Sequence, residues 1–370
     1  MKILVCFGTR PEAIKMAPVC HELKKQGIPY KLCVTGQHRE MLDQVLDFFE
    51  LTPDYDLDLM KHNQGLNELS ARILVGMNTI FDSELFDMVL VHGDTTTSSM
   101  VALASFHKGI QVGHVEAGLR TYNKKSPFPE ELNRQLTGRI ADLHFAPTKG
   151  AREHLLSENV SSKSISVTGN TVTDALLYAV SKVSGTFKSK SIETLETLVD
   201  SSKKLILVTG HRRESFGQGF TQFCEALLEI ATDKNVQLIY PVHLNPNVQD
   251  VVYAMLSKTS NIHLIDPLEY PSFVWLMSKA SVIISDSGGI QEEAPSLHIP
   301  VVVTRDTTER QEGVDAGVSF LVGTNKQAIV KKTSEILSDL NSFKNMSNPY
   351  GDGKASKKIV DFLMTFKSTS

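Results

Sequence analysis

The sequence has few cysteines and no pattern that would use them together. Four cysteines lie far apart in 370 residues and form no C-x-x-C pair, which argues against a disulfide framework and favours a reduced protein. No apolar run approaches membrane length, and no signal-peptide pattern begins the chain. Lys and Arg form no long run, and the net charge of -4 argues against a nucleic-acid-binding protein. We therefore expect a cytoplasmic protein that binds neither nucleic acid nor membrane.

The motifs of redox and metal enzymes are also missing. No G-x-G-x-x-G fingerprint follows the first apolar strand, which argues against a nicotinamide cofactor. H-E-x-x-H and zinc-type Cys/His spacings do not occur, so a pair such as His114 and Glu116 stays incomplete as a metal site. The sequence predicts neither a cofactor nor a metal.

What the sequence does have is a regular alternation of apolar strands and helical segments. Strands are expected at residues 2–7, 30–35, 87–92, 110–115, 143–146 and 165–169, and in a second series at 204–209, 237–242, 262–265, 282–285, 301–304 and 320–322. This alternation predicts an α/β fold with two doubly wound, Rossmann-like domains that face a central cleft.

The domain boundaries follow from the same two series. We place the first domain at residues 1–170, joined by a C-terminal helix at 354–370, and the second at 171–353. Residues 181–203 are rich in Ser, Lys and Thr, so we expect them to form a surface segment that joins the two halves.

Residues 281–297 (SVIISDSGGIQEEAPSL) contain the most informative motif. An apolar strand ends before Ser287, which can cap a helix, and Gly288 and Gly289 let the free N–H groups of that helix approach an anion. Glu293 follows one helical turn later and can accept both hydroxyls of a ribose, which favours binding of a nucleoside diphosphate. The alternative is an ordinary capped helix with acids favoured by its dipole.

Charged residues follow other predicted strands as well, where the carboxyl ends of parallel strands meet. Arg10 and Lys15 flank the start of the first helix, where two cations suit a diphosphate; the alternative is a pair of surface cations.

Three acids in the first half and one histidine in the second suit proton transfer. Asp94 and Glu116 follow strands, and Glu130 begins a helix; each is alternatively a helix cap. Their convergence with His211 would favour acid–base chemistry, because burial and mutual repulsion raise the pKa of a carboxyl group towards neutrality.

The second half offers further ligand contacts at its own strand ends. His211 and Arg213 lie in a dense polar loop, and His243 follows the next strand. Phe273 can pack on a nucleobase or belong to the core, and Arg310 can contact phosphate or pair with a neighbouring glutamate.

Several ordered blocks of sequence combine these residues. They are FGTRPEAIKMAP (7–18), VHGDTTT (91–97), GHVEAGLRT (113–121), TGHRRESFG (209–217), SDSGGIQEEAPSL (285–297) and RDTTERQE (305–312), with further blocks up to NPYGDG near residue 350. Together they resemble the non-hydrolysing UDP-N-acetylglucosamine 2-epimerases of bacteria. The resemblance implies the glycosyltransferase-B fold, a homodimer, and interconversion of UDP-GlcNAc and UDP-ManNAc for cell-surface polysaccharide synthesis.

The resemblance also implies roles for residues at matching positions. The implied catalytic residues are Asp94, Glu116, Glu130 and His211. Contacts to UDP or the sugar are implied for Asp94, Glu116 and His211 again, and for Arg10, Lys15, Leu268, Phe273, Ser287, Gly288, Gly289, Glu293 and Arg310. Leu268 stands where a relative has Gln, so its contact would run through the main chain. Some relatives bind a second UDP-GlcNAc as an activator, which implies a site near Gln37, Arg213 and His243.

The implied reaction has defined chemical requirements. Inversion at C2 without a redox cofactor requires loss of the C1 substituent: a carboxylate removes the C2 proton, UDP leaves anti to give 2-acetamidoglucal, and UDP returns after protonation on the other face. The alternatives are an epimerase of a related UDP-2-acetamido sugar, a UDP-sugar-dependent glycosyltransferase, a hydrolysing epimerase, and a non-enzymatic UDP-sugar-binding regulator.

Overall fold

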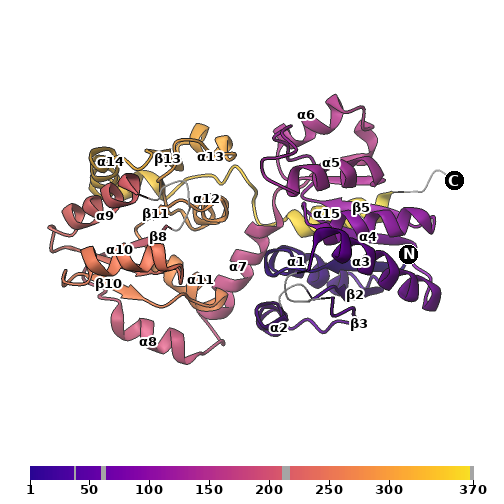
Figure 1. The fold of residues 1–370 in the computed structure, drawn as a ribbon, viewed down its shortest axis with the longest axis horizontal. Helices are drawn as coiled ribbons and strands as arrows, with labels where there is room; N and C mark the ends of the chain where they lie inside the picture. The colour runs from indigo at the N-terminus through magenta and orange to yellow at the C-terminus, as the bar shows by residue number, and fades with distance from the viewer. Residues whose placement is uncertain (37–38, 60–63, 211–216, 367–370) are drawn as a thin grey trace. The chain divides into compact units, whose positions relative to one another are not determined.

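A computed structural model describes residues 1–36, 39–59, 64–210 and 217–366 of the chain (Figure 1). Three positions with expected roles, Gln37, His211 and Arg213, lie outside these described residues. The chain divides into two compact units: unit 1 comprises residues 1–175 and 351–370, and unit 2 comprises residues 176–350. The expected boundary after residue 170 stands just before helix α7 (Thr171–Val183), and the units divide within that helix.

Unit 1 is built on a parallel sheet with the strand order β3-β2-β1-β4-β5-β6-β7. Its strands are β1 (Ile3–Phe7), β2 (Tyr30–Val34), β3 (Tyr55–Asp56), β4 (Met88–His92), β5 (Gln111–Val115), β6 (Leu143–Ala146) and β7 (Ile165–Val167). It contains the first residues of α7, and its complete helices are α1 (Arg10–Lys25), α2 (Arg39–Phe48), α3 (Leu66–Ser83), α4 (Thr96–His107), α5 (Glu130–Ile140), α6 (Lys149–Ser157) and α15 (Ala355–Thr365).

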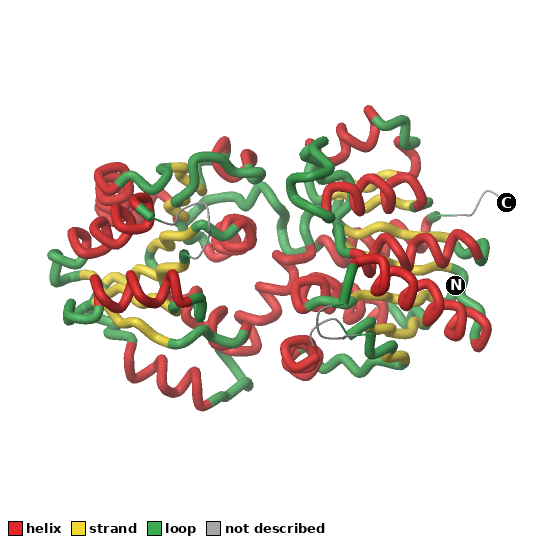
Figure 2. Tube along the Cα trace, in the orientation of Figure 1, coloured by secondary structure: helices red, strands yellow, loops and turns green. Residues whose placement is uncertain are grey.

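Strand β1 explains why this sheet lies at the centre of its unit. All five of its residues are buried and apolar, as in a strand that is covered on both faces. Leu4 and Cys6 belong to the hydrophobic cluster that includes Ile73 of α3 and Val101 of α4, and the alternating residues of β1 face the opposite side. Figure 2 shows the yellow strands of each unit flanked by red helices.

Unit 2 repeats this architecture with the strand order β10-β9-β8-β11-β12-β13. Its strands are β8 (Lys204–Thr209), β9 (Val236–Pro241), β10 (Ile262–Ile265), β11 (Val282–Ser285), β12 (Val301–Val303) and β13 (Ser319–Leu321). Its helices are α8 (Lys190–Leu198), α9 (Gln218–Ile230), α10 (Pro246–Leu256), α11 (Tyr270–Lys279), α12 (Gly288–Glu293), α13 (Gln311–Asp315) and α14 (Lys326–Ser338).

Residues 181–203 were expected to join the two halves as a surface segment, but they lie within unit 2 and include helix α8. The Ser189 hydroxyl caps this helix by accepting a hydrogen bond from the Ile192 N–H at 3.2 Å. Ile192 and Leu195 are buried, and the helix packs against α11 within unit 2. The polar composition of the segment concealed these buried positions.

The last helix completes unit 1 rather than unit 2. Helix α15, drawn in yellow among the indigo and purple elements in Figure 1, packs against α1. Its N-terminus is held by the buried Asp174 carboxylate of α7, which accepts hydrogen bonds from the Ala355 N–H at 3.1 Å and the Ser356 N–H at 2.8 Å. No helix within the described ranges combines the length and apolar character needed to cross a bilayer.

Each sheet has one point where the strand order reverses. In unit 1 this point lies between β1 and β4, and in unit 2 between β8 and β11. Open α/β sheets bind ligands at the carboxyl ends of the strands beside such a point. A ligand site is therefore expected at the loops that follow these four strands.

Candidate active site

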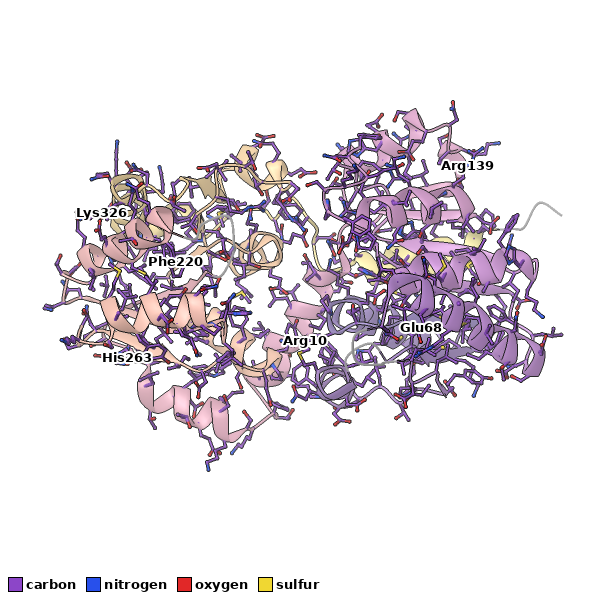
Figure 3. All side chains as sticks on the ribbon, viewed as in Figure 1. Arg10, Glu68, Arg139, Phe220, His263 and Lys326 are labelled. Atoms are coloured by element: carbon purple, nitrogen blue, oxygen red, sulfur yellow. The ribbon has the colours of Figure 1, made fainter. Side chains whose placement is uncertain are left out.

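The loop after β1 leads directly into α1, whose first residue is Arg10 (labelled in Figure 3). Thr9 and Glu12 form a capping box at this helix start. The buried Glu12 carboxylate accepts hydrogen bonds from the N–H groups of Gly8 and Thr9, at 3.0 and 2.8 Å, and from the Thr95 hydroxyl at 2.7 Å. Glu12 thereby fastens the end of β1 to the loop after β4, which also contains the expected catalytic Asp94.

The Asp94 carboxylate is paired with an arginine of α5. Its Oδ2 accepts hydrogen bonds from Nε of Arg134 at 3.0 Å and from a terminal nitrogen of the same guanidinium at 2.7 Å. Arg134 also contacts Glu131 at 3.3 Å. Glu130 is the first residue of α5, and its Oε2 is buried without a hydrogen-bond partner among the described residues.

Glu116 follows β5 and has the left-handed φ of +65°. Its side chain is 9% exposed, and its Oε2 bonds to the Lys15 ammonium of α1 and accepts a hydrogen bond from the Asn170 amide at 2.9 Å. Burial alone would raise the pKa of this carboxyl group, but Lys15, His92 and the Asn170 bond outweigh burial and hold the pKa below its ordinary value. The expected rise of carboxyl pKa values towards neutrality is therefore wrong for Glu116.

His114 of β5 supports the same region from within the sheet. Its Nε2 lies 2.7 Å from the Gly93 carbonyl oxygen, so Nε2 donates and Nδ1 is left without a proton. Burial lowers the pKa of His114 to about 3, so the ring is neutral. Within the described ranges, no group of three or more His, Cys, Asp or Glu residues is placed to hold a metal ion.

The predicted strand, turn and helix at residues 281–297 are present in unit 2, with one difference at the cap. Helix α12 begins at Gly288, so Glu292 and Glu293 lie in its last turn. Ser287 is the N-cap residue, but its side chain makes no capping bond; its N–H instead donates to the Ser285 hydroxyl at 2.9 Å. Pro295 ends the α-helix, and residues 294–297 form a 3₁₀ turn.

Arg310 lies across the start of α12. A Cβ atom on Gly288 would be 2.8 Å from Cζ of Arg310, so glycine lets the guanidinium approach the helix backbone. Nε of Arg310 donates to Glu292 at 3.0 Å, and a terminal nitrogen contacts Glu309 at 3.3 Å. Arg310 thus pairs with its neighbour Glu309, which is one of the two alternatives that the sequence left open, and also with Glu292, which the sequence analysis did not identify.

The other expected contacts of unit 2 lie on two strand-end loops and a helix. Leu268 is half-buried in the loop between β10 and α11, and Phe273 is half-buried on α11. His243 is exposed after β9, and its Nδ1 accepts a hydrogen bond from the Asn245 N–H at 3.0 Å.

Asn170 is another site residue that the sequence analysis missed. It is the last residue of the loop between β7 and α7, and its amide donates a hydrogen bond to Glu116. The strand-end rule that selected Asp94 and Glu116 applies to this position too. The strand-end position was therefore a signal for Asn170, but the prediction selected charged residues, and asparagine is uncharged.

A comparison with protein families decides what these two units are. The family model described as UDP-N-acetylglucosamine 2-epimerase matches residues 21–364 of the chain. The chain belongs to the UDP-N-acetylglucosamine 2-epimerase family. It is therefore an enzyme of the isomerase class, as the resemblance predicted.

Individual epimerases of the family match over nearly the whole chain. The UDP-N-acetylglucosamine 2-epimerase of Escherichia coli K12 is 55% identical over 371 residues, covering 98% of each chain. A crystal structure of the Neisseria meningitidis UDP-GlcNAc 2-epimerase bound to UDP-GlcNAc has a TM-score of 0.88 and 49% identity, covering 99% of this chain and 100% of that one.

A more distant epimerase has the same fold. The Methanocaldococcus jannaschii UDP-GlcNAc 2-epimerase, solved in complex with UDP-GlcNAc and UDP, has a TM-score of 0.80 and 33% identity, covering 99% of this chain and 100% of that chain. The predicted α/β fold with two Rossmann-like domains of the glycosyltransferase-B type is confirmed.

Proposed function

We propose that this epimerase is of the non-hydrolysing type and interconverts UDP-GlcNAc and UDP-ManNAc. The main support is the arrangement of two carboxylates, one after β4 and one after β5. These two strands are neighbours in the sheet, and their last residues, His92 and Val115, lie opposite each other. Asp94 is bonded to Arg134, and Glu116 to Lys15, so each acid has a cation beside it. The substrate is further supported by the Neisseria relative that was solved with UDP-GlcNAc.

The reaction begins when a carboxylate takes the C2 proton. The electron pair of the C2–H bond forms the C1=C2 double bond, and the C1–O bond breaks with its electrons leaving on UDP. The resulting 2-acetamidoglucal accepts a proton at C2 on the other face, and the UDP oxygen re-forms the bond to C1. Two faces require proton-transfer groups in two places, for which Asp94, Glu116, Glu130 and His211 are the candidates.

The UDP leaving group requires positive charge and N–H donors. We assign Arg310 with residues 287–289 of unit 2, and Arg10 with Lys15 of unit 1, to the phosphates. Glu293 would accept the ribose hydroxyls, Phe273 would lie by the uracil, and Leu268 would contribute its main chain. The half-buried positions of Glu293 and Phe273 leave part of each side chain accessible to a ligand.

Incubation with UDP-GlcNAc in deuterated water tests this function. We expect UDP-ManNAc with deuterium at C2, because the proton removed from C2 exchanges with solvent before the return step. NMR and mass spectrometry of the products distinguish the alternatives. Free sugar with UDP would indicate a hydrolysing enzyme, turnover only with an added acceptor would indicate a glycosyltransferase, and UDP binding without exchange would indicate a regulator. Faster turnover of a related UDP-2-acetamido sugar than of UDP-GlcNAc would identify that sugar as the substrate.

The ribose assignment of Glu293 gives a separate prediction. The Glu293→Ala variant is expected to weaken UDP binding by about 1 to 3 kcal/mol, because a charged hydrogen bond to the ribose is lost. Isothermal titration calorimetry with UDP measures this change. Glu335→Ala is the control, because it removes an exposed acid of α14 in the same unit. Unchanged UDP affinity in the Glu293 variant would refute the assignment.

We also propose that the enzyme is a homodimer. Phe128, Leu132 and Leu136, spaced four residues apart along α5 and the turn before it, are 66%, 39% and 42% exposed. An apolar row of this kind on one helix face favours contact with another protein surface. Light scattering would give twice the mass of one chain, and the mass of a single chain would contradict the proposal.

From the resemblance we also expect a cytoplasmic enzyme that supplies cell-surface polysaccharide synthesis. An activator site near Gln37, Arg213 and His243 is a further proposal from the same source. A sigmoidal dependence of the rate of UDP-ManNAc consumption on added UDP-GlcNAc would support it.

A further inference from the structure

His92 is a buried imidazole that the proposed reaction does not use. It is the last residue of β4, two positions before Asp94, and its side chain is 4% exposed. Neither ring nitrogen has a hydrogen-bond partner among the described residues. Leaving a buried polar group unpaired costs free energy, and such groups in folded proteins are uncommon. A second state in which the ring finds a partner would explain why this position carries a histidine.

The nearest candidate partner is the carboxylate of Glu116. Nε2 of His92 lies 3.8 Å from Oε2 of Glu116, which is beyond hydrogen-bond distance. That oxygen is already bonded to the Lys15 ammonium and the Asn170 amide. His92 therefore lies beside Oε2 of Glu116 without bonding to it, while Lys15 and Asn170 occupy that oxygen.

Lys15 is the donor that a substrate could remove. This step rests on the proposed function, in which the Lys15 ammonium contacts the diphosphate. The diphosphate carries more negative charge than the single carboxylate of Glu116 and competes with it for that ammonium. Departure of Lys15 would leave Glu116 with Asn170 and an open position on Oε2. We propose that His92 is a positioning residue that donates a hydrogen bond to Oε2 of Glu116 when Lys15 turns to the diphosphate.

The charge of His92 decides how this exchange affects Glu116. Burial lowers the pKa of His92 to about 4. The charges of Glu116 and Asp94 favour the protonated imidazole, whereas the charge of Lys15 disfavours it. The other imidazole close by, His114, is neutral. At neutral pH the imidazole therefore donates a hydrogen bond without bringing a positive charge. Replacing an ammonium by a neutral donor raises the proton affinity of Glu116 while keeping its carboxylate oriented. The bound substrate itself would thus make Glu116 a stronger base.

Two variants of His92 separate the hydrogen bond from the packing of the ring. His92→Leu removes the donor, and we expect kcat to fall about ten- to a hundredfold with KM within about threefold, the range for a lost bond to a charged group. His92→Gln keeps an N–H donor that cannot titrate, and we expect it to restore most of the rate. The acidic limb of the kcat profile, which reports the substrate complex, should move to higher pH in the Leu variant only. His144→Leu removes a buried imidazole from β6 and is the control for packing.

The outcomes distinguish this inference from the proposed function. A Leu variant with the wild-type rate and pH profile would overturn the role of His92, as would a Gln variant as slow as the Leu variant. If the Leu variant does not fold, slow turnover by a folded Gln variant would overturn it. If the wild type forms no UDP-ManNAc, the proposed function fails. A ¹³C NMR titration of Glu116 with UDP bound still tests His92, because its loss should raise the pKa of Glu116; an unchanged pKa would overturn the inference.

Discussion

Replacing Glu116 with glutamine is expected to lower kcat for epimerisation by about 10²- to 10⁴-fold, the usual contribution of a group that transfers a proton. The amide has nearly the same shape and can still accept hydrogen bonds from Lys15 and Asn170, but it cannot take or return a proton. UDP affinity should stay within about threefold, or roughly 0.7 kcal/mol. Steady-state kinetics with UDP-GlcNAc, together with calorimetry using UDP, measure both quantities.

The control and the pH dependence sharpen this test. Glu153→Gln removes an exposed acid from α6 and should leave kcat unchanged. Because Lys15 keeps the pKa of Glu116 below its ordinary value, the carboxylate of the free enzyme stays ionised at mildly acidic pH. Any acidic limb that Glu116 contributes to kcat/KM should therefore lie at a lower pH than that at which a free glutamate titrates. Equal losses of kcat and UDP affinity in the Glu116 variant would instead assign Glu116 to nucleotide binding.

Replacing Gly118 with alanine is expected to destabilise unit 1 severely. Gly118 has a φ of +88°, and a Cβ atom there would lie 2.2 Å from the carbonyl oxygen of Ala151 at the start of α6. Left-handed strain costs about 1 to 2 kcal/mol and forced overpacking about 1 to 3 kcal/mol, so we expect a loss of about 2 to 5 kcal/mol in the free energy of unfolding. Urea denaturation followed by circular dichroism measures the loss.

A second glycine of unit 1 separates the two contributions. Gly27 also has a left-handed φ, +69°, but a Cβ atom there would meet no atom within 4 Å. Gly27→Ala should therefore cost only the backbone strain, about 1 to 2 kcal/mol. Equal losses in the two variants would show that the contact with Ala151 relaxes freely. Because Gly118 follows Glu116 by two residues, a folded Gly118 variant is also expected to lose activity.

The sequence was most informative where the determining features are local. An apolar run such as residues 204–209 specifies a buried strand by itself, and β8 occupies the expected residues. The strand-end rule found Asp94 and Glu116 for the same reason, since it needs only the position after a strand. Helix α8 was missed because its buried residues are few and its composition is polar.

The charge state of the site could not be predicted in this way. Lys15 and Glu116 are 101 residues apart in the chain, and Asn170 is a further 54 residues from Glu116. The sequence identifies Glu116 but not the donors that surround it, and these donors decide whether its pKa is raised or lowered. For Glu116, the expectation of a raised pKa failed because Lys15 and Asn170 bond to its carboxylate.

The position of α15 has a consequence for the order in which the protein is made. Residues 176–350 are continuous and contain every strand of the second sheet, so unit 2 can fold as soon as that stretch has left the ribosome. The first 175 residues leave the ribosome earlier, yet the face of α1 that packs against α15, and the Asp174 carboxylate that binds the N–H groups of Ala355 and Ser356, are completed only by the final twenty residues. The half of the enzyme that is synthesised first is thus the half that is completed last.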